Sequence, residues 1–414
     1  MNHKLKKFIK KFIPNSILQA YGRKIIDYRI TEFAEKINSE KQLHKEYAMG
    51  INLIGPVRAA MGLGQSCRLL ADILENTEYD FCIKDFSLGN GVVDLDHTYD
   101  LKICDDIKYN INIFHIEPIE LMCAAPQMGE EVWNGRYNIA FWLWELESFP
   151  KAWNKSFDLI DEIWTPSEFT SSCLRKYTDK PIYTIPYCIS APTDEKYGRE
   201  YFGLPEERFL FLCMYDTNST MERKNPSAVI RAFQKAFQEN DNKVGLILKM
   251  NNPTEQDIRQ INNMIGNYNN IYIFTDILDK VAVNSLIKCV DVFVSLHRAE
   301  GFGLVMAEAM LNGTPCIATN WSSNTEFMNE EVACMVDYEF VTLKKSVPPY
   351  EKGIRWANAN VEHAAFYMKK LYQDREFYNQ LADKAQKYVA EKLEMEKAVK
   401  LVQNRIKEIG GEYY

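Results

Sequence analysis

Several features that mark secreted, membrane-spanning or nucleic-acid-binding proteins are missing from this sequence. The ten cysteines are scattered without a Cys-x-x-Cys pair, which indicates buried, reduced thiols in a cytoplasmic protein. No apolar run reaches the roughly 18–20 residues that a membrane span needs. We also expect no secretory signal peptide, because an apolar core with a small-residue cleavage site is missing. Positive charge is not in excess: the net charge is −8, which argues against general nucleic-acid binding.

The most informative stretch of the chain runs from residue 290 to residue 319. Val290–Ser295 is a short, β-branched apolar run, the pattern of a strand buried on both faces. Gly301-Phe302-Gly303 interrupts this pattern, and good helix formers follow over Leu304–Leu311. Asn312-Gly313 then predicts the end of the helix, and Cys316–Thr319 predicts the next strand. The stretch is therefore expected to form a strand–loop–helix–strand unit.

The loop of this unit has the properties of a ligand site. It is expected at the carboxyl end of a parallel strand and at the start of a helix, where open α/β sheets bind ligands. Free N–H groups and the helix dipole there favour a phosphate, and the two glycines allow a diphosphate to approach the backbone. Glu300 precedes the loop and Glu308 lies in the helix, and carboxylates accept hydrogen bonds from sugar hydroxyls. A nucleotide sugar offers both a diphosphate and hydroxyls.

The same residues resemble a known family signature. Glu300 and Glu308, with seven residues between them, are similar to the Glu-x7-Glu signature of retaining glycosyltransferases of the family 4 type (glycosyl transferases group 1). The resemblance implies the α/β fold called GT-B, in which two Rossmann-like domains face each other across a cleft and a C-terminal crossover helix returns to the first domain. It implies that Glu308 holds the ribose hydroxyls and that Glu300 contacts the donor sugar. It further implies donor contacts from Gly301, Phe302, Gly303 and Leu304. A glutamate pair at this spacing, taken alone, also fits a solvated helix face.

The first half of the chain contains a second glycine-rich loop after a predicted strand. Gly50–Gly55 predicts the first strand of a Rossmann-like domain, and Gly62 and Gly64 follow before a helix from Cys67 to Leu74. A Gly-x-Gly alone fits a tight turn, but this one resembles the family's loop that faces the donor diphosphate across the cleft. His115 ends a further strand, and the resemblance implies that it reaches the hydroxyls of the donor sugar. A lone histidine also fits a buried polar role.

Asp94-Leu95-Asp96 has the form of the metal-binding triplet of the other large glycosyltransferase fold. It lies in a polar stretch, and nothing nearby resembles that fold. We therefore interpret the triplet as part of a loop, and we expect neither a metal nor another cofactor.

Five of the seven tryptophans lie within residues 133–164. The segment YNIAFWLWELESFP resembles a strand of a bacterial polysaccharide and mannosyltransferase-like subgroup of the family. Aromatic faces stack on sugar rings, so we expect Trp144 and Glu145, at the end of this strand, to contact the acceptor. Core packing is the alternative, and we prefer it for Trp142 and Trp164.

The second domain is expected to carry a cluster of cations. Arg223 and Lys224 are expected at the first turn of a helix, where cations beside free N–H groups favour a diphosphate. They resemble the family's Arg…Lys-Gly element, but Tyr215-Asp216 stands where an arginine usually follows the first strand. Arg223 is our candidate replacement for that arginine. Lys249, after a further strand, is either a third donor-binding cation or a solvated lysine.

Residues 1–48 differ from the rest of the chain. Near the N-terminus, five lysines interleave with an apolar stripe at helical spacing, and residues 17–26 continue that spacing after Pro14. The lysines are Lys4, Lys6, Lys7, Lys10 and Lys11, and the stripe is Leu5, Phe8, Ile9, Phe12 and Ile13. A basic amphipathic helix on an acidic protein is typical of membrane-surface contact. Residues 4–26 are therefore a candidate peripheral anchor at the inner face of the cell membrane. The alternative is a terminal helix docked on the protein's own core.

The chain contains enough apolar material for more than one core. It is 414 residues long and 46% hydrophobic, so two domains of ordinary size are expected and wholesale disorder is not. The expected order is the basic segment 1–48, an N-terminal Rossmann-like acceptor domain 49–190, a polar linker 191–207, a nucleotide-sugar-binding domain 208–390 and a crossover helix 391–414.

These expectations combine into an enzyme hypothesis: metal-independent, retaining transfer of a hexose from a UDP- or GDP-linked sugar to a glycan or lipid-linked acceptor in surface polysaccharide synthesis. The expected catalytic residues are Glu300, Arg223, Lys224 and His115, with the leaving diphosphate stabilised electrostatically. The alternative is a catalytically inactive GT-B protein that binds the donor as a scaffold or regulator of a glycan assembly complex. The joint presence of both glutamates and both cations favours the enzyme. An epimerase or phosphorylase is less favoured, because no lysine stands in a cofactor-binding context.

Overall fold

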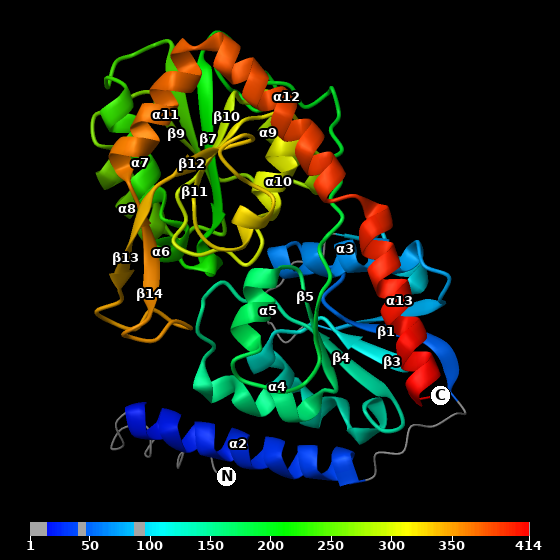
Figure 1. Cartoon of the computed structure of the whole chain (residues 1–414). Helices are drawn as coiled ribbons and strands as arrows, with labels where there is room; N and C mark the ends of the chain where they lie inside the picture. Colours follow the sequence, from blue (N-terminus) through cyan, green and yellow to red (C-terminus); the bar gives the residue numbers. More distant parts are fainter. Residues whose placement is uncertain (1–14, 40–46, 87–95, 414) are drawn as a thin grey trace.

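Two parallel six-stranded sheets form the framework of the protein (Figure 1). The computed structural model describes residues 15–39, 47–86 and 96–413. Each sheet belongs to its own Rossmann-like domain, and a long C-terminal helix runs from the second domain back to the first. This arrangement confirms the α/β fold of the GT-B type that the sequence predicted.

The first domain is built on the sheet with strand order β2-β1-β3-β4-β5-β6. Strand β1 is paired on both sides, with Ile51 opposite Phe81 and Ile111. Strands β3 and β4 are buried along nearly their whole length, as expected for parallel strands covered on both faces. The strands are β1 (Ala48–Gly55), β2 (Phe81–Asp85), β3 (Tyr109–Phe114), β4 (Tyr137–Phe141), β5 (Glu162–Thr165) and β6 (Ile182–Thr184). The helices are α3 (Gly62–Glu75), α4 (Pro118–Met128) and α5 (Glu168–Leu174), with a 3-10 segment η3 (Lys151–Leu159).

The second domain is built on the sheet with strand order β12-β11-β10-β7-β8-β9. Its strands are β7 (Phe209–Asp216), β8 (Val244–Asn251), β9 (Ile271–Phe274), β10 (Val292–Ser295), β11 (Cys316–Thr319) and β12 (Cys334–Val336). Its helices are α6 (Met221–Lys224), α7 (Pro226–Ala236), α8 (Glu255–Ile265), α9 (Lys280–Cys289), α10 (Leu304–Leu311), α11 (Val361–Gln373) and α12 (Arg375–Lys392). The stretch 290–319 thus folds as β10, loop, α10 and β11, in the order that its local pattern predicted.

A two-stranded antiparallel hairpin, which the sequence analysis did not anticipate, follows β12. It consists of β13 (Tyr338–Thr342) and β14 (Arg355–Ala359), paired from Tyr338 opposite Ala359 to Thr342 opposite Arg355. In Figure 1 the hairpin projects from the second domain alongside the first. Its connecting loop carries Tyr350, which is 4% exposed and packs in a core cluster of the first domain.

Helix α13 (Met395–Tyr413) returns to the first domain and packs against α3 (Figure 1). A buried ion pair anchors it: Arg405 Nη2 lies 2.7 Å from Glu162 Oε2. The Glu162 carboxylate also accepts hydrogen bonds from Trp164 Nε1, at 2.6 Å, and from the Tyr137 hydroxyl, at 3.0 Å. Removing one partner of such a pair leaves an uncompensated buried charge, which typically costs about 3–5 kcal/mol.

Helix α2 (Asn15–Ser39) lies along the first domain beside α4 and η3 (Figure 1). Its apolar side chains Ile30, Phe33 and Ile37 are buried there, and the ring of Phe33 meets Trp133 edge to face at 5.4 Å. The second half of the N-terminal segment is therefore docked on the core of the first domain, which was the alternative to membrane contact. The lysine-flanked stripe, residues 4–13, lies outside the described residues. None of the helices in the described ranges combines the length and the apolar character that crossing a bilayer requires.

The segment 191–207, expected as a polar linker, packs on the second domain over much of its length. Arg199 Nε donates to Cys289 O at 2.7 Å, and Arg199 Nη2 lies 2.8 Å from Asp291 Oδ2. Phe202 and Leu204 are buried in the same region. These contacts fix the path of the segment 191–207 along the second domain.

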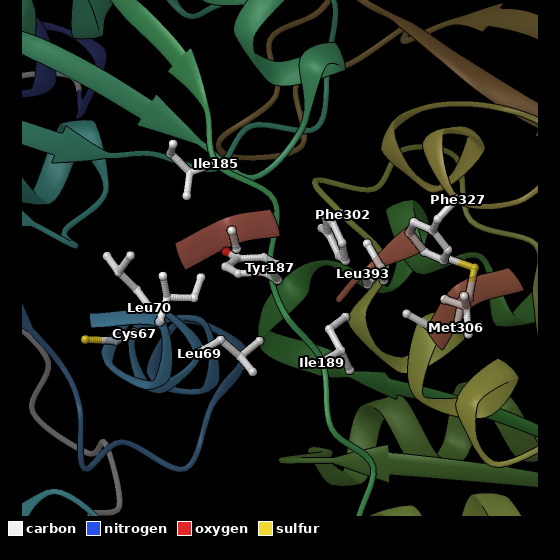
Figure 2. Packing of buried hydrophobic residues seen from close by; sticks show 14 of the residues in the cluster. Cys67, Leu69, Leu70, Ile185, Tyr187, Ile189, Phe302, Met306, Phe327 and Leu393 are labelled. Carbon is white, nitrogen blue, oxygen red and sulfur yellow. The ribbon is translucent and has the colours of Figure 1, made fainter. Parts of the chain in front are cut away.

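Buried apolar side chains also connect the two domains near the start of α10. Tyr187, in the segment that leaves the first domain, lies between Leu70 of α3 and Phe302 of the second domain (Figure 2). The rings of Tyr187 and Phe302 meet edge to face at 4.9 Å. The domains therefore make direct contact beside the loop that the sequence marked as a ligand site.

Candidate active site

The loop after β10 brings Glu300 to both cations of α6. A backbone hydrogen bond from Arg298 N to Arg223 O, at 2.8 Å, joins the two segments. Lys224 Nζ lies 2.6 Å from Glu300 Oε2, and Arg223 Nη1 lies 3.9 Å from the same oxygen. Three of the four residues that were expected to be catalytic thus form one ionic cluster.

The cations do not lie at the first turn of the following helix, as the sequence analysis expected. They end the short helix α6, and Asn225, in the left-handed conformation with φ +55°, separates them from α7. Pro226 begins α7 because proline suits the first helical position but cannot donate a backbone hydrogen bond to an earlier turn. The side chains therefore reach Glu300 from the end of α6.

Arg223 is buried and Lys224 and Glu300 are partly buried, and the opposite charges favour the ionised form of Glu300 and Arg223. Burial by itself raises the pKa of Glu300, but Lys224 and Arg223 outweigh burial and lower this pKa to about 2. Burial by itself lowers the pKa of Arg223, but Glu145, Tyr350 and Glu300 raise it above its ordinary value. Burial keeps the pKa of Lys224 below its ordinary value despite Glu300. Glu300 and Arg223 are therefore both ionised at neutral pH.

The glycine loop lies between the domains. Gly303 has φ +101°, a left-handed conformation that favours glycine. It is the residue that caps the start of α10. Phe302 is buried, with its ring 5.2 Å from that of Phe327 (Figure 2). Gly301 faces the first domain: a Cβ there would lie 3.8 Å from Leu143 Cβ, and Ser167 Oγ donates to Gly301 O at 3.4 Å. Residues of the first domain therefore contact the backbone of this loop.

Glu308 lies inside α10 with only 1% of its surface exposed. One carboxylate oxygen, Oε1, pairs with Lys280 Nζ at the start of α9. The other oxygen, Oε2, is buried, and none of the residues that the structure describes gives it a hydrogen bond. A buried carboxylate oxygen without a partner costs free energy, and a ligand hydroxyl would supply the missing donor. This is the arrangement that a ribose-binding glutamate needs.

A serine-rich loop supports Glu300 from the other side. Glu300 N donates to Ser322 Oγ at 3.0 Å, and Ser323 N donates to Glu300 O at 3.4 Å. Ser323 Oγ also lies 3.0 Å from Ser167 Oγ of the first domain. The backbone of Glu300 is thus fixed by a loop that touches both domains.

Lys249 is placed differently from the cations of α6. It lies within β8, is 1% exposed, and donates to Asn251 Oδ1 of the same strand. Burial lowers its pKa to about 8. Across the described residues, no hydrogen bond or ion pair joins Lys249 to Lys224 or Glu300. Its expected donor contact remains a prediction.

The first glycine loop is shorter than expected, because α3 already begins at Gly62. Gly64 is required by packing, since a Cβ there would lie 2.2 Å from Ala59 O. Gly62 is exposed, and a Cβ there would meet nothing within 4 Å. Both glycines therefore lie in the first turn of a fourteen-residue helix, and donor contact there would come from the helix N-terminus.

His115 is fully buried just beyond the end of β3. Its Nε2 lies 2.7 Å from Ser66 Oγ, and this hydroxyl is also bonded to Tyr187, whose ring meets Phe302. Burial lowers the pKa of His115 to about 4, so the ring is neutral at pH 7. Its Nδ1 is buried and has no hydrogen-bond partner among the residues in the described ranges, which leaves one position for a hydrogen bond to a ligand or to water.

The structure corrects the expectation for Trp144 as an acceptor platform. Trp144 is 4% exposed and lies among the rings of Phe149, Trp153 and Tyr350. Its indole N–H donates to Ser148 O at 2.8 Å. With the domains in this arrangement, the ring is not exposed for stacking on a sugar. The hairpin loop that covers it lies about two hundred residues later in the chain, and local sequence gave no sign of it.

Glu145, in contrast, points toward the ionic cluster. Its Oε1 lies 3.5 Å from Arg223 Nε and accepts a hydrogen bond from the Tyr350 hydroxyl. It was expected to contact the acceptor, and the structure places it beside a cation of the second domain. Trp142 and Trp164 are fully buried, as the core-packing interpretation predicted.

The structure describes only the last residue of the aspartate triplet. Asp94 lies outside the described residues, while Asp96 Oδ2 lies 3.1 Å from Arg68 Nε. No group of three or more potential ligand residues occurs among the residues that the structure describes.

Three contributors to the site escaped the sequence analysis: Lys280, Ser66 and Tyr350. Lys280 opens α9 and pairs with Glu308, and Ser66 lies in α3 beside His115. No motif marks these positions, because each acts through a partner that is distant in the sequence.

The second domain matches a described family. Residues 202–388 match the family Glycosyl transferases group 1. The match lies within the second domain, and the architecture of the chain as a whole is of the GT-B type. Among curated proteins, none matches the sequence.

Solved structures show the same fold at low sequence identity. HepE (Alr3699) of Anabaena, in complex with UDP and glucose, superposes with a TM-score of 0.65 at 13% identity, over 87% of this chain and 100% of that chain. Sucrose-phosphate synthase of Thermosynechococcus elongatus gives 0.63 at 13%, over 88% and 100%. The pneumococcal O-GlcNAc transferase GtfA, in complex with UDP and GlcNAc, gives 0.51 at 14%, over 72% and 56%. These likenesses extend across both domains.

Proposed function

We propose that this protein is a retaining, metal-independent hexosyltransferase that uses a nucleotide sugar as its donor. The observation that carries the proposal is the spatial arrangement of Arg223, Lys224 and Glu300 beside the N-terminus of α10. Further along the same helix lies Glu308, whose buried Oε2 has no hydrogen-bond partner within the described part of the chain. Cations and free N–H groups suit a diphosphate, and the carboxylates suit sugar and ribose hydroxyls.

In this proposal, each group has a role matched to its charge. Arg223, Lys224 and the N-terminus of α10 take up the negative charge that develops on the leaving diphosphate. Removing one such preorganised charged contact typically costs on the order of 10²–10³ in rate. Glu308 holds the ribose, while Glu300 and His115 contact the donor sugar. The acceptor hydroxyl attacks from the face that the diphosphate leaves, and its proton passes to the departing phosphate.

The free site holds its charges in internal pairs. Lys224 pairs with Glu300, and Lys280 pairs with Glu308. Donor binding would exchange these pairs for contacts with the diphosphate and the hydroxyls, so the charged groups are already in place. Gly301 and Ser167 touch across the domains, and the domains would have to part for the donor to enter.

The proposed donor is a UDP-linked hexose, with a GDP-linked hexose as the next candidate. UDP, with glucose or GlcNAc, is bound by two of the similar structures, and this supports testing UDP sugars first. The proposed acceptor is a glycan or a lipid-linked sugar in surface polysaccharide synthesis. A mannosyltransferase-like activity within that class is part of the same proposal.

A screen of UDP- and GDP-sugars by thermal shift, followed by a turnover assay, tests the proposal. The expected result is stabilisation by one nucleotide sugar and release of free nucleoside diphosphate that increases when an acceptor glycan is added. Lys224→Met should abolish most of this release, whereas Lys243→Met, at an exposed position away from the cluster, should not. Donor binding without any release, with every acceptor tested, would instead support the inactive scaffold.

A further inference from the structure

The hairpin β13–β14 brings one polar atom into the ionic cluster. Tyr350, in the loop between the two strands, donates its hydroxyl to Glu145 Oε1. The same oxygen lies 3.5 Å from Arg223 Nε. One carboxylate oxygen of the first domain is thus shared by a phenol and a guanidinium, both carried by the second domain.

Neighbouring aromatic rings and backbone hydrogen bonds fix the position of Tyr350. Its ring is 4% exposed, 5.3 Å from that of Trp356 and 6.2 Å from that of Trp144. Backbone hydrogen bonds of 2.9 and 2.7 Å between Val347 and Tyr350 close the turn that carries it. The hydroxyl is therefore aimed at Glu145 by packing.

The hairpin is also fixed to both sides of the site. Ala357 N of β14 donates to Arg298 O at 3.1 Å, and Arg298 N donates to Arg223 O at 2.8 Å. Toward the first domain, Arg355 Nη2 lies 2.8 Å from Glu147 Oε2. A change in the hairpin is therefore transmitted directly to the segments that carry Arg223 and Glu145.

Backbone carbonyl groups orient the Arg223 side chain, and the nearby carboxylates neutralise its charge only in part. Its guanidinium donates to two backbone carbonyls, Ser219 O at 3.3 Å and Ala299 O at 3.0 Å. The carboxylates of Glu145 and Glu300 lie 3.5 and 3.9 Å away, longer than the roughly 2.7–2.9 Å of a tight charge-assisted bond. A tight, two-pronged pair with Glu145 would occupy donors that a diphosphate needs.

We propose that Tyr350 is a positioning residue for Arg223: its hydroxyl holds the Glu145 carboxylate and so limits the competition of that carboxylate with the donor diphosphate for the guanidinium. The inference rests on the proposed role of Arg223 in diphosphate binding. Burial and the neighbouring Glu145 raise the pKa of Tyr350 above its ordinary value, so the phenol keeps its proton and remains a donor at neutral pH.

The test measures the affinity for UDP by titration calorimetry, with GDP as the second probe, on the full chain and its variants. Tyr350→Phe removes one oxygen and should weaken UDP binding about tenfold, the effect of about 1.4 kcal/mol, because Glu145 then turns fully toward Arg223. Glu145→Gln should strengthen UDP binding, because the competing charge is gone while the backbone carbonyls still orient Arg223. In the Glu145→Gln background, Tyr350→Phe should have no further effect.

Two comparisons separate this role from a general loss of structure. Tyr338→Phe, on the same hairpin, should leave UDP affinity unchanged, since that ring packs against Trp321 and Phe340. The opposite directions of the two single variants cannot come from destabilisation alone. If Tyr350→Phe does not fold, the direction of Glu145→Gln still decides.

The inference is overturned if Tyr350→Phe binds UDP like the wild type, if Glu145→Gln weakens binding, or if the two effects add. Failure of the wild-type chain to bind UDP or GDP overturns the proposed function, and this inference with it. Wild-type binding with an unchanged Tyr350→Phe variant overturns this inference alone.

Discussion

At the scale of the residue, the charged groups of the site are held by partners from other elements. Glu300 is held by Lys224 and Ser322, Glu308 by Lys280, and Glu145 by Tyr350. Burial makes each of these partners necessary, because an unpaired charge in a region of low dielectric constant is expensive. Lys224 also lowers the pKa of Glu300, so this carboxylate is ionised before a ligand arrives.

Glu308→Ala should weaken nucleotide-sugar binding, because two ribose hydroxyls lose a charged acceptor. A hydrogen bond to a charged group is worth about 1.5–3 kcal/mol, which corresponds to roughly 10- to 150-fold in the dissociation constant. Calorimetric titration with the donor measures the change. The matched control is Glu255→Ala, since Glu255 pairs with Arg259 at an exposed position of α8. Unchanged donor affinity and activity in a folded Glu308→Ala protein would contradict the assignment.

His115 should make the stability of the protein depend on pH. Its folded pKa of about 4 lies below the ordinary 6.5, so the unfolded chain binds the proton first as the pH falls. The stabilisation is present above pH 6.5 and is lost between 6.5 and 4, on the order of 3 kcal/mol in all. The unfolding free energy of the wild type, relative to that of His115→Gln, should decrease by this amount between pH 7 and pH 4. His97→Gln, at an exposed site, is the control, and identical pH profiles for the wild type and His115→Gln would refute the assignment.

At the scale of the element, the same kind of segment can serve packing and recognition at once. Helix α2 buries Ile30, Phe33 and Ile37 against the first domain, while the lysine-rich stripe precedes it in the chain. Helix α10 is capped by Gly303 and carries Glu308 on its buried side. The hairpin β13–β14 covers Trp144 and delivers Tyr350 to the site.

Deleting residues 1–14 should release the protein from anionic vesicles. Each lysine near such a surface contributes about 1 kcal/mol, and apolar burial adds to it, which suffices for reversible binding. Binding by the full chain should weaken with salt, because the charge is screened over roughly 8–10 Å at physiological ionic strength. Vesicle co-sedimentation measures both effects, with zwitterionic vesicles as the control.

Turnover on a soluble acceptor should survive this deletion, because the buried residues of α2 are retained. A truncated protein that precipitates, or that melts much earlier than the full chain, would show that residues 1–14 belong to the core. The docked alternative would then extend over the whole N-terminal segment.

At the scale of the whole molecule, the two domains meet through polar contacts around the site. Glu326 accepts from Phe169 N at 2.8 Å, Ser167 lies 3.0 Å from Ser323, and Arg355 pairs with Glu147. α13 adds the buried Arg405–Glu162 pair at the first residue of β5. Groups from both domains are therefore needed to complete the site.

Activity should be insensitive to EDTA, since the leaving diphosphate is assigned to Arg223, Lys224 and the N-terminus of α10. The initial rate of nucleoside diphosphate release, with and without chelator, checks this. Loss of activity that Mg²⁺ or Mn²⁺ restores would contradict the assignment. It would direct attention to Asp94 and Asp96, with Asp96→Asn as the variant to examine.

Local pattern was sufficient for the strand–loop–helix–strand unit at 290–319, and the family resemblance of that unit implied the fold built around it. The apolar run of β10 and the turn chemistry of Gly301-Phe302-Gly303 can be read from residues that are close in the sequence, so the amino-acid order alone predicts the strand and the turn. The same holds for Glu300 and Glu308, whose placement follows from the loop and from the first turns of α10.

Tertiary structure alone decided which side chains meet. Lys280 and Glu308 are 28 residues apart in sequence, Lys224 and Glu300 are 76 apart, and Tyr350 and Glu145 are 205 apart. Trp144 was expected to be open because the aromatic pattern of its strand does not show which ring a distant hairpin will cover. Such pairs form only when two independently folded segments are packed together, and no local periodicity or cap encodes that packing.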